Sequence, residues 1–237
     1  MRIIEAAPHK ARLKDEAMKK IFMERSAQML SDIYDSMENL PDLKIKQLES
    51  EKTAVVFVDI INGFISEGTL HDKRIGRIIP EAVKLLKYAN LAGMKSLAFA
   101  DCHSESAAEF SAFPPHCISG SHESEIADEL ENIGGYLLIE KNSTNGFHAP
   151  GFQQFIKSCG KENFIVCGDC TDICVMNFCL TLKTYFDQND KKCKIAVPVN
   201  ITETFDGNGH YSEFMNKSAL CFMRNAGIEL FGGIDYE

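Results

Sequence analysis

The sequence contains no long apolar run and no surplus of basic residues. No apolar stretch approaches the roughly 20 residues that a helix needs to span a bilayer, so we expect no membrane span. The chain carries 34 acidic and 25 basic side chains, a net charge of −9, which argues against nucleic acid or an anionic membrane as a partner. Tryptophan, internal repeats and low-complexity stretches are also missing. An apolar fraction of 45% excludes global disorder and predicts a globular protein.

The sequence shows neither a secretory signal nor a regular framework of cysteine pairs. Residues 1–20 lack an apolar segment followed by a small-residue cleavage site. The nine cysteines are odd in number and are spread along a mid-sized chain. Both observations predict a cytoplasmic protein with reduced thiols, of which one or more are chemically active.

The first 50 residues differ in composition from the rest of the chain. Residues 10–39 are rich in Lys, Glu, Met and Ala, and from Met29 onward apolar residues recur at spacings of three and four. This pattern predicts one or two amphipathic helices, which end at Leu40-Pro41 because a residue before proline avoids the helical conformation. The main domain or a partner subunit must cover the apolar stripe, so we expect a homo-oligomer. We therefore divide the chain into an N-terminal helical extension, residues 1–50, and a main domain, residues 51–237.

The main domain alternates short apolar runs with helical stretches. Strands are predicted at 53–59, 95–101, 136–141, 163–168, 194–199 and 227–230. Helices are predicted at about 78–92, 122–132, 149–159, 172–188 and 210–225. Short, almost wholly apolar strands that alternate with helices are typical of a parallel sheet covered on both faces. The predicted fold class is therefore α/β, with a six-stranded parallel sheet flanked by helices on both faces.

Reactive side chains follow four of the predicted strands. The first strand ends on Asp59, the second on Asp101, with His103 just beyond it, and the third on Lys141. The fourth turns through DCTDIC into a helix that begins near Cys174. Ligands of parallel α/β sheets bind beyond the carboxyl ends of the strands, so we expect these groups to converge at one edge.

Asp59, Lys141 and Cys174 together predict a nucleophilic cysteine. Taken singly they have ordinary interpretations, as a turn-capping carboxylate, a solvated strand end and a small buried thiol. A cysteine at a helix N-terminus beside a lysine, however, is expected to have a lowered pKa and to react as the thiolate. A neighbouring carboxylate can take the thiol proton and return it to a leaving amine, and backbone N–H groups of the turn can face an oxyanion. This combination suits hydrolysis of an amide through a thioester.

A second group of polar residues lies in the loop DCHSESAAEFSAFPPHC. Asp101 and His103 are two residues apart, and Glu109 and His116 follow, with Glu105 as a spare carboxylate. Such mixed nitrogen and oxygen ligands suit one catalytic divalent ion, for which Zn²⁺ is preferred and Mn²⁺ or Fe²⁺ also fits. The other interpretation is a polar loop in which the histidines make ordinary hydrogen bonds.

A run of cysteines at 167, 170, 174 and 179 has a second interpretation outside enzymes. Cysteines at such spacings can hold zinc or an iron–sulfur cluster, as in a non-catalytic metal or redox protein. Against this, Cys167 lies inside an apolar strand run, and Cys174 and Cys179 are five residues apart on a predicted helix, so they point to different faces.

Several motifs of the main domain match a known family. They are VDIINGF at 58–64, DCH at 101–103, FPPHCISGS at 113–121, the EK pair at 140–141 and CGDCTDICV at 167–175. In this order they resemble the isochorismatase-like cysteine hydrolases and, among these, the nicotinamidases of NAD salvage. The resemblance covers about three quarters of the chain, from residue 53 to 230, and omits the N-terminal extension.

This resemblance implies a Rossmann-like fold and a role for each matching residue. The implied triad is Asp59, Lys141 and Cys174, and the implied oxyanion hole is formed by the backbone N–H groups of Cys170 and Cys174. A cis peptide bond is implied at Asp169–Cys170. The resemblance also implies a divalent metal that binds a pyridine nitrogen, with Asp101, His103, Glu109 and His116 as its ligands. Two aromatic residues, Phe64 and Phe113, are implied to hold the pyridine ring.

Departures from the family pattern concern the substrate more than the reaction. Ile61 stands where the family usually has Gln, and Phe113 stands where nicotinamidases often have Trp. The loop from His103 to His116 is short, and the N-terminal extension is not a standard feature. We therefore predict a hydrolase of a small carboxamide, nicotinamide first, with another small amide, a ureido compound or isochorismate as alternatives.

Overall fold

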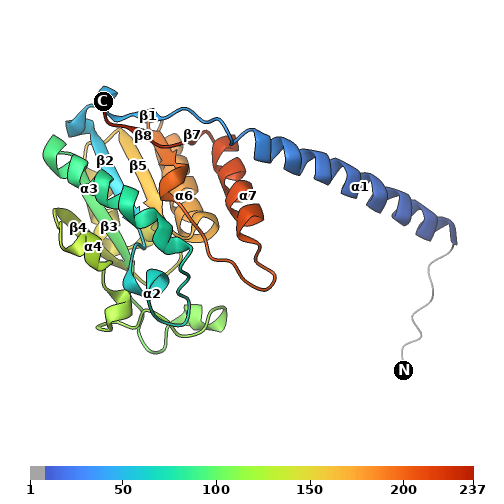
Figure 1. Ribbon diagram of the computed structural model, residues 1–237, viewed down its shortest axis with the longest axis horizontal. Coiled ribbons are helices and arrows are strands. Elements are labelled where there is room, and N and C mark those ends of the chain that lie inside the picture. Colours follow the sequence, from blue (N-terminus) through green and yellow to red (C-terminus); the bar gives the residue numbers. More distant parts are fainter. Residues whose placement is uncertain (1–8) are drawn as a thin grey trace. The chain divides into compact units, whose positions relative to one another are not determined.

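The computed structural model describes residues 9–237, which form two units. The first unit ends at Asn39 and contains helix α1, His9–Asp35, one continuous helix where the sequence allowed one or two. The second unit, Leu40–Glu237, holds every strand of the described chain (Figure 1). The homo-oligomer expected from the apolar stripe of the extension stays a prediction.

The second unit is built around a parallel sheet. Its strands are β2 Thr53–Val58, β3 Lys95–Asp101, β4 Tyr136–Lys141, β5 Asn163–Gly168, β6 Lys194–Pro198 and β7 Glu229–Phe231. Its helices are α2 Asn62–Ile65, α3 Ile79–Ala92, α4 Asp128–Glu131, α5 Pro150–Ser158, α6 Met176–Gln188 and α7 Ser212–Asn225. The six strands follow the order β4-β3-β2-β5-β6-β7, and all neighbours are parallel. The direction of winding reverses between β2 and β5, which is where sheets of this kind bind ligands.

Helices cover both faces of the sheet with apolar side chains. On one face, Phe57 of β2 belongs to the same buried cluster as Leu85 of α3. On the other face, the ring of Phe99 in β3 packs edge-on against Phe152 of α5 and Phe178 of α6, with ring centres 5.6 and 5.0 Å away. Alternate residues of a strand point to opposite faces, so burial on both sides explains why these strands are continuous apolar runs.

The expected fold class is confirmed, and all six strands lie within a few residues of their predicted positions. The helix predicted at 122–132 is wrong. That segment forms one 3-10 turn, His122–Ser124, and the single helical turn α4. Between these two turns the segment is held by the chain after β2, since the Asn62 N–H donates to the Glu125 carbonyl oxygen and the Ala127 N–H to that of Ile60.

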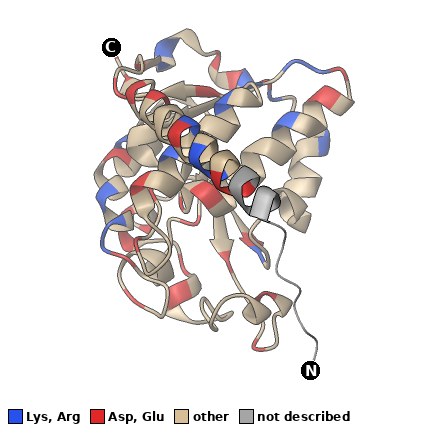
Figure 2. Ribbon diagram, turned by 90° about the vertical axis from the view of Figure 1, so that its right-hand side faces the viewer, with Lys and Arg blue, Asp and Glu red and all other residues tan. Residues whose placement is uncertain are grey.

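Two short strands, β1 Leu43–Lys44 and β8 Ile234–Asp235, pair in parallel apart from the main sheet. The segment 102–135, between β3 and β4, contains seven acidic residues and no Lys or Arg, and Figure 2 shows where the acidic and basic residues lie along the ribbon. Among the helices that the structure describes, none combines the length and the apolar character needed to cross a membrane.

Candidate active site

Four of the predicted site residues lie at one edge of the sheet, where four neighbouring strands end. Asp59 follows β2, Asp101 ends β3 and Lys141 ends β4, while β5 leads into the turn that carries Cys174. The register of β3 against β4 sets Asp101 opposite Lys141. The structure therefore brings together these four residues, which are far apart in the sequence.

The turn after β5 is shaped by Gly168 and by a cis peptide bond. Gly168 has a φ of 122°, and a Cβ atom there would collide with the Val58 carbonyl oxygen, so only glycine fits. The peptide bond between Asp169 and Cys170 is cis, as the resemblance implies. The chain then makes one turn of π-helix, Thr171–Val175, before α6 begins. Such turns are frequent at functional sites, and this one contains Cys174.

Lys141 lies between the other two members of the predicted triad. Its Nζ is 2.8 Å from Asp59 Oδ2 and 3.7 Å from Cys174 Sγ. The same ammonium donates to Asp101 Oδ1 at 2.5 Å and to the Ser143 carbonyl oxygen at 3.1 Å. The side chains of the triad and of Asp101 are all buried. One buried ammonium therefore balances two buried carboxylates.

Burial and the shared ammonium set the protonation of these groups. Burial raises the pKa of Asp59 to about 6, although Lys141 acts in the opposite direction. Burial also acts to raise the pKa of Asp101, but the Lys141 ammonium and the neighbouring His103 and His116 outweigh it, so the pKa of Asp101 is lowered. Burial would lower the pKa of Lys141, yet the two carboxylates raise it well above its usual value. Lys141 thus stays charged, and Asp59 is the carboxyl that can exchange a proton near neutral pH.

The lowered pKa expected for Cys174 is wrong. Burial raises the pKa of this thiol well above its usual value, and Lys141 lowers it only in part, because Asp59 and Asp101 raise it further. A thiolate here would be a third anion beside a single ammonium. Cys174 therefore rests as a thiol, and a base must take its proton as it reacts. Asp59 is placed for this, since a carboxylate oxygen of Asp59, one of Asp101 and Cys174 Sγ all lie within 4.8 Å of one another.

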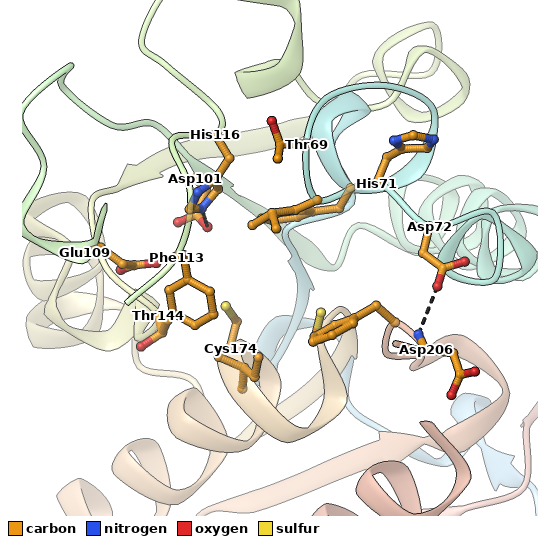
Figure 3. A pocket seen from close by; sticks show the side chains of 15 residues that line it. Thr69, His71, Asp72, Asp101, Glu109, Phe113, His116, Thr144, Cys174 and Asp206 are labelled. Atoms are coloured by element: carbon orange, nitrogen blue, oxygen red, sulfur yellow. Dashed lines mark hydrogen bonds and ion pairs between the residues drawn. The ribbon is translucent and has the colours of Figure 1, made fainter. Parts of the chain in front are cut away.

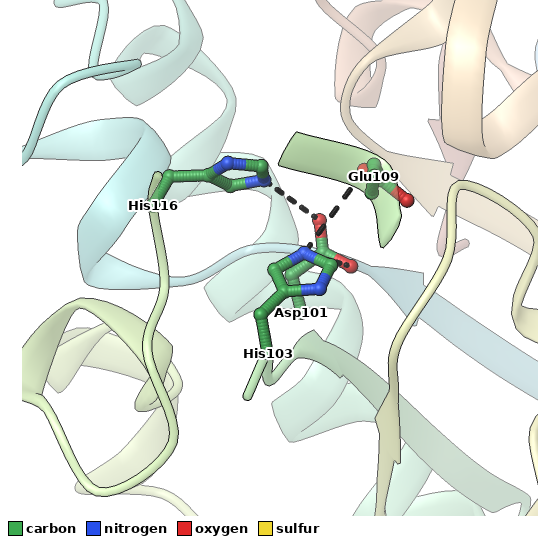
Figure 4. A group of neighbouring side chains, drawn as sticks. All are labelled: Asp101, His103, Glu109 and His116. Carbon is green, nitrogen blue, oxygen red and sulfur yellow. Dashed lines mark ion pairs between the residues drawn. The ribbon is translucent and has the colours of Figure 1, made fainter. Parts of the chain in front are cut away.

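Asp101, His103, Glu109 and His116 converge on one point (Figure 4). One ligand atom of each lies within 4.8 Å of the others. His103 Nε2 is 3.6 Å from Asp101 Oδ1 and 4.0 Å from Glu109 Oε1, and His116 Nε2 is 3.8 Å from Asp101 Oδ2. These separations exceed hydrogen-bond lengths and suit donors arranged around an ion. Glu105 is exposed and does not belong to the group.

Both histidines of this cluster turn the same ring nitrogen toward its centre. His103 Nδ1 is 2.7 Å from Asn142 Oδ1, and His116 Nδ1 is 2.8 Å from the Pro114 carbonyl oxygen. His103 Nε2 is buried without a hydrogen-bond partner among the described residues. Buried polar atoms are nearly always paired, and metal-bound histidines usually make an outer hydrogen bond through their second nitrogen. The four residues therefore fit a divalent ion.

A cavity of about 240 Å³ lies between Cys174 and this cluster (Figure 3). Residues of both groups and three phenylalanines line it, among them Asp101, Glu109, His116, Cys174, Phe64, Phe113 and Phe205. Phe64 and Phe113 thus both line the cavity, and their role in holding a ring stays a prediction. Ile61 is fully buried, pairs with Ile126 and does not line the cavity.

Comparison with known proteins places this chain in a family. Residues 53–219 match the family model described as the isochorismatase domain. The chain belongs to the isochorismatase family. It is a hydrolase of that family. Nicotinamidase 1 of Arabidopsis thaliana is 27% identical to it over 212 residues, which are 77% of this chain and 86% of the relative.

Solved structures of the isochorismatase fold resemble the chain at lower identity. PnC1 from L. infantum, in complex with nicotinate, has a TM-score of 0.66 at 19% identity, with 78% of this chain and 94% of that chain covered. Pyrazinamidase of Pyrococcus horikoshii, in complex with zinc, has a TM-score of 0.62 at 20% identity, with 76% and 98% covered. At these identities the likeness shows a shared fold.

Asn142, Phe110 and Phe205 are among the site residues that were not predicted from the sequence. Asn142 directly follows Lys141 at a predicted strand end, so its position near the site could have been predicted. Its contact with His103 could not have been predicted from the sequence. Phe110 packs its ring 5.3 Å from that of His103 and 5.6 Å from that of His116, and it lies between two predicted ligands in the sequence. Phe205 lies in a segment without any recognisable motif, and no local signal marked it.

The cysteine run of 167–179 does not form a cluster. Cys167 is fully buried in β5 and Cys179 is fully buried in α6. Among the residues whose side chains are described, neither group of possible metal ligands contains more than one of these four cysteines. This arrangement argues against the metal or redox protein considered from the sequence.

Proposed function

We propose that this protein is a metal-assisted cysteine amidohydrolase that converts nicotinamide and water into nicotinate and ammonia. The observation that carries the proposal is a single cavity that Cys174 lines together with three of the four metal-ligand side chains, while Lys141 behind it contacts both Cys174 and Asp59. Two relatives support the substrate, one named a nicotinamidase and one described in complex with nicotinate.

Binding of the flat pyridine ring is assigned to the phenylalanines of the cavity. Phe64 and Phe113 both line it, and both rings lie near His116, with centres 5.8 and 6.3 Å from the imidazole. Aromatic side chains bind flat rings through stacked or edge-on contacts. This arrangement orients the carboxamide of the substrate toward Cys174.

Cys174 is the proposed nucleophile and Asp59 its base. Sγ forms a bond to the carboxamide carbon while the thiol proton passes to Asp59, whose raised pKa suits it to accept and return a proton near neutral pH. When the tetrahedral intermediate collapses, the C–N bond breaks and Asp59 gives that proton to the departing ammonia. Lys141 keeps its charge throughout and holds Asp59 in place at 2.8 Å.

Backbone N–H groups of Cys170 and Cys174 are the proposed oxyanion hole. Cys170 follows the cis peptide bond and lines the cavity together with Cys174. Within the described chain the Cys170 N–H makes no backbone hydrogen bond, which leaves this donor available to the substrate. Donors fixed by the fold stabilise a developing oxyanion without reorganisation.

Asp101, His103, Glu109 and His116 would hold the divalent ion, preferably Zn²⁺, the metal bound in one structural neighbour. When bound, the ion supplies a Lewis acid for the ring nitrogen of the substrate. In the second half of the reaction, a water attacks the thioester carbon and gives its proton to Asp59, and the C–S bond breaks. Asp59 then returns the proton to Cys174, and the product leaves as nicotinic acid, which gives its carboxyl proton to solvent and becomes nicotinate.

The substrate is tested by ammonia release from a panel of amides with the metal-loaded protein. Nicotinamide, N-carbamoylsarcosine and a short aliphatic amide separate the alternatives. We expect turnover of nicotinamide at a much higher kcat/KM than that of the other two. Turnover of the ureido compound without turnover of nicotinamide would contradict the nicotinamidase assignment and leave the cysteine hydrolase mechanism in place.

A further inference from the structure

The segment between β6 and α7 lies along the turn that carries Cys174. Thr202 pairs with Gly168 as a parallel β-bridge. The Glu203 N–H donates to the Gly168 carbonyl oxygen at 3.2 Å, and the Thr171 N–H donates to the Glu203 carbonyl oxygen at 3.0 Å. Two backbone hydrogen bonds therefore fix the start of this segment to the chain just before the nucleophile.

Hydrogen bonds on both sides hold Phe205 in this segment. Before it, Thr204 Oγ1 donates to Asp172 Oδ1 at 2.6 Å, and Asp172 belongs to the same turn as Cys174. After it, the Asp206 N–H donates to Asp72 Oδ2 at 2.9 Å, and both of these residues line the cavity (Figure 3). Phe205 itself is half-buried and lines the cavity with Cys170 and Cys174. Its backbone is thus tied to two different walls of the cavity.

His210 backs the Phe205 ring. The two rings are stacked, with centres 3.8 Å apart and an angle of 12° between their planes. His210 Nδ1 is 3.0 Å from the Phe205 carbonyl oxygen, and His210 Nε2 is 2.9 Å from Asp172 Oδ2. Asp172 therefore connects the imidazole to the turn of the nucleophile, and the imidazole covers one face of the phenyl ring.

We propose that Phe205 is a specificity-determining wall of the cavity for flat aromatic amides and that His210 is a positioning residue that holds its ring. The inference rests on the proposed function and extends it from one substrate to a substrate class. The backbone on either side of Phe205 is held by hydrogen bonds, and His210 covers one face of its ring. Such a ring loses little conformational freedom when a ligand stacks or packs edge-on against it. A short aliphatic amide has no ring to pack against Phe205, so it gains much less binding free energy from this contact.

The direct test is the kinetics of Phe205→Ala with nicotinamide and with a short aliphatic amide. We expect KM for nicotinamide to rise about tenfold with kcat nearly unchanged, and kcat/KM for the aliphatic amide to change less than about twofold. Phe214→Ala is the matched control, because Phe214 is exposed on α7 and does not line the cavity. An unchanged KM for nicotinamide in Phe205→Ala overturns the proposal.

The role of His210 is tested by a double-mutant cycle. If His210 acts through Phe205, His210→Ala raises KM for nicotinamide in the wild-type background but has little further effect in the Phe205→Ala background. His210→Phe, which keeps a stacked ring, should restore part of the loss. Equal effects of His210→Ala in both backgrounds, or a loss of kcat in place of a rise in KM, contradict the positioning role.

A binding measurement separates this inference from the proposed function. If the wild type releases no ammonia from nicotinamide, the proposed function fails, and calorimetry with nicotinamide on Cys174→Ala decides the question of Phe205. About tenfold weaker binding after Phe205→Ala in that background supports the aromatic wall. Equal binding with and without Phe205, or no binding in either variant, overturns it.

Discussion

Lys141 and Asp101 form an ion pair of 2.5 Å at the point where the predicted triad meets the predicted metal ligands. The pair follows from the register of β3 and β4, which sets the two residues opposite each other. The same ammonium contacts Asp59 at 2.8 Å. One lysine therefore links the charge of the proposed base to that of a proposed metal ligand, and the two parts of the site form one electrostatic unit.

Loss of Lys141 should damage both stability and activity. Lys141→Met leaves two buried carboxylates without a counter-ion, and breaking a buried ion pair in this way costs about 3–5 kcal/mol. We expect the free energy of unfolding, measured by urea denaturation, to fall by about this amount and nicotinamide turnover to be lost. Lys87→Met is the matched control at an exposed lysine of α3. Equal stability of the two variants would contradict the role of Lys141.

Asn142 should control metal affinity through His103. Asn142→Ala removes the acceptor 2.7 Å from His103 Nδ1, and loss of such an outer partner weakens metal binding about 10–100-fold. Asn142→Asp keeps an acceptor oxygen and should retain most of the affinity, while Asn132→Ala, at an exposed asparagine, should change nothing. Competition of the apoprotein with a chromophoric zinc chelator measures these affinities. Wild-type affinity in Asn142→Ala would refute this role.

Activity should fall in acid as Asp59 takes up a proton. Burial raises the pKa of this carboxyl to about 6, and the proposed mechanism needs it ionised before Cys174 attacks. We therefore expect kcat/KM for nicotinamide to be flat above this pKa and to fall about tenfold for each pH unit below it. Asp59→Asn should be inactive throughout. A profile that stays flat well below the pKa would argue against Asp59 as the base.

The fold was predictable because strands that are buried on both faces of a sheet have almost wholly apolar sequences. Runs such as 95–101 and 163–168 are almost wholly apolar since helices cover both sides of β3 and β5. The segment 122–132 was predicted wrongly because hydrogen bonds to residues 60–62 interrupt it between two short turns, which a local pattern does not reveal.

The site was predictable as far as strand ends determine it. Asp59, Asp101 and Lys141 each follow a readable strand. The protonation of Cys174 was not predictable, because it depends first on the burial of the thiol and then on Asp59 and Asp101, which share its lysine in the folded chain. Partners such as His103 and Asn142, 39 residues apart, likewise meet only in the folded chain.

Metal content should separate the two parts of the site. His103→Ala removes a buried ligand nitrogen and should lose the ion that the wild type retains after zinc loading and desalting, as measured by elemental mass spectrometry. Cys174→Ala should keep that ion, because the thiol is not among the four converging ligands. Loss of the ion from Cys174→Ala, or its full retention in His103→Ala, would contradict the assignment of ligands.

Ammonia release from nicotinamide by the wild type, Cys174→Ala and Cys170→Ala tests the central claim most directly. The two cysteines lie in one turn and line one cavity, but only Cys174 is the proposed nucleophile, while Cys170 contributes its backbone N–H. The account predicts release by the wild type, none by Cys174→Ala, and substantial release by Cys170→Ala, which keeps that N–H. Release by Cys174→Ala at the wild-type rate would contradict it.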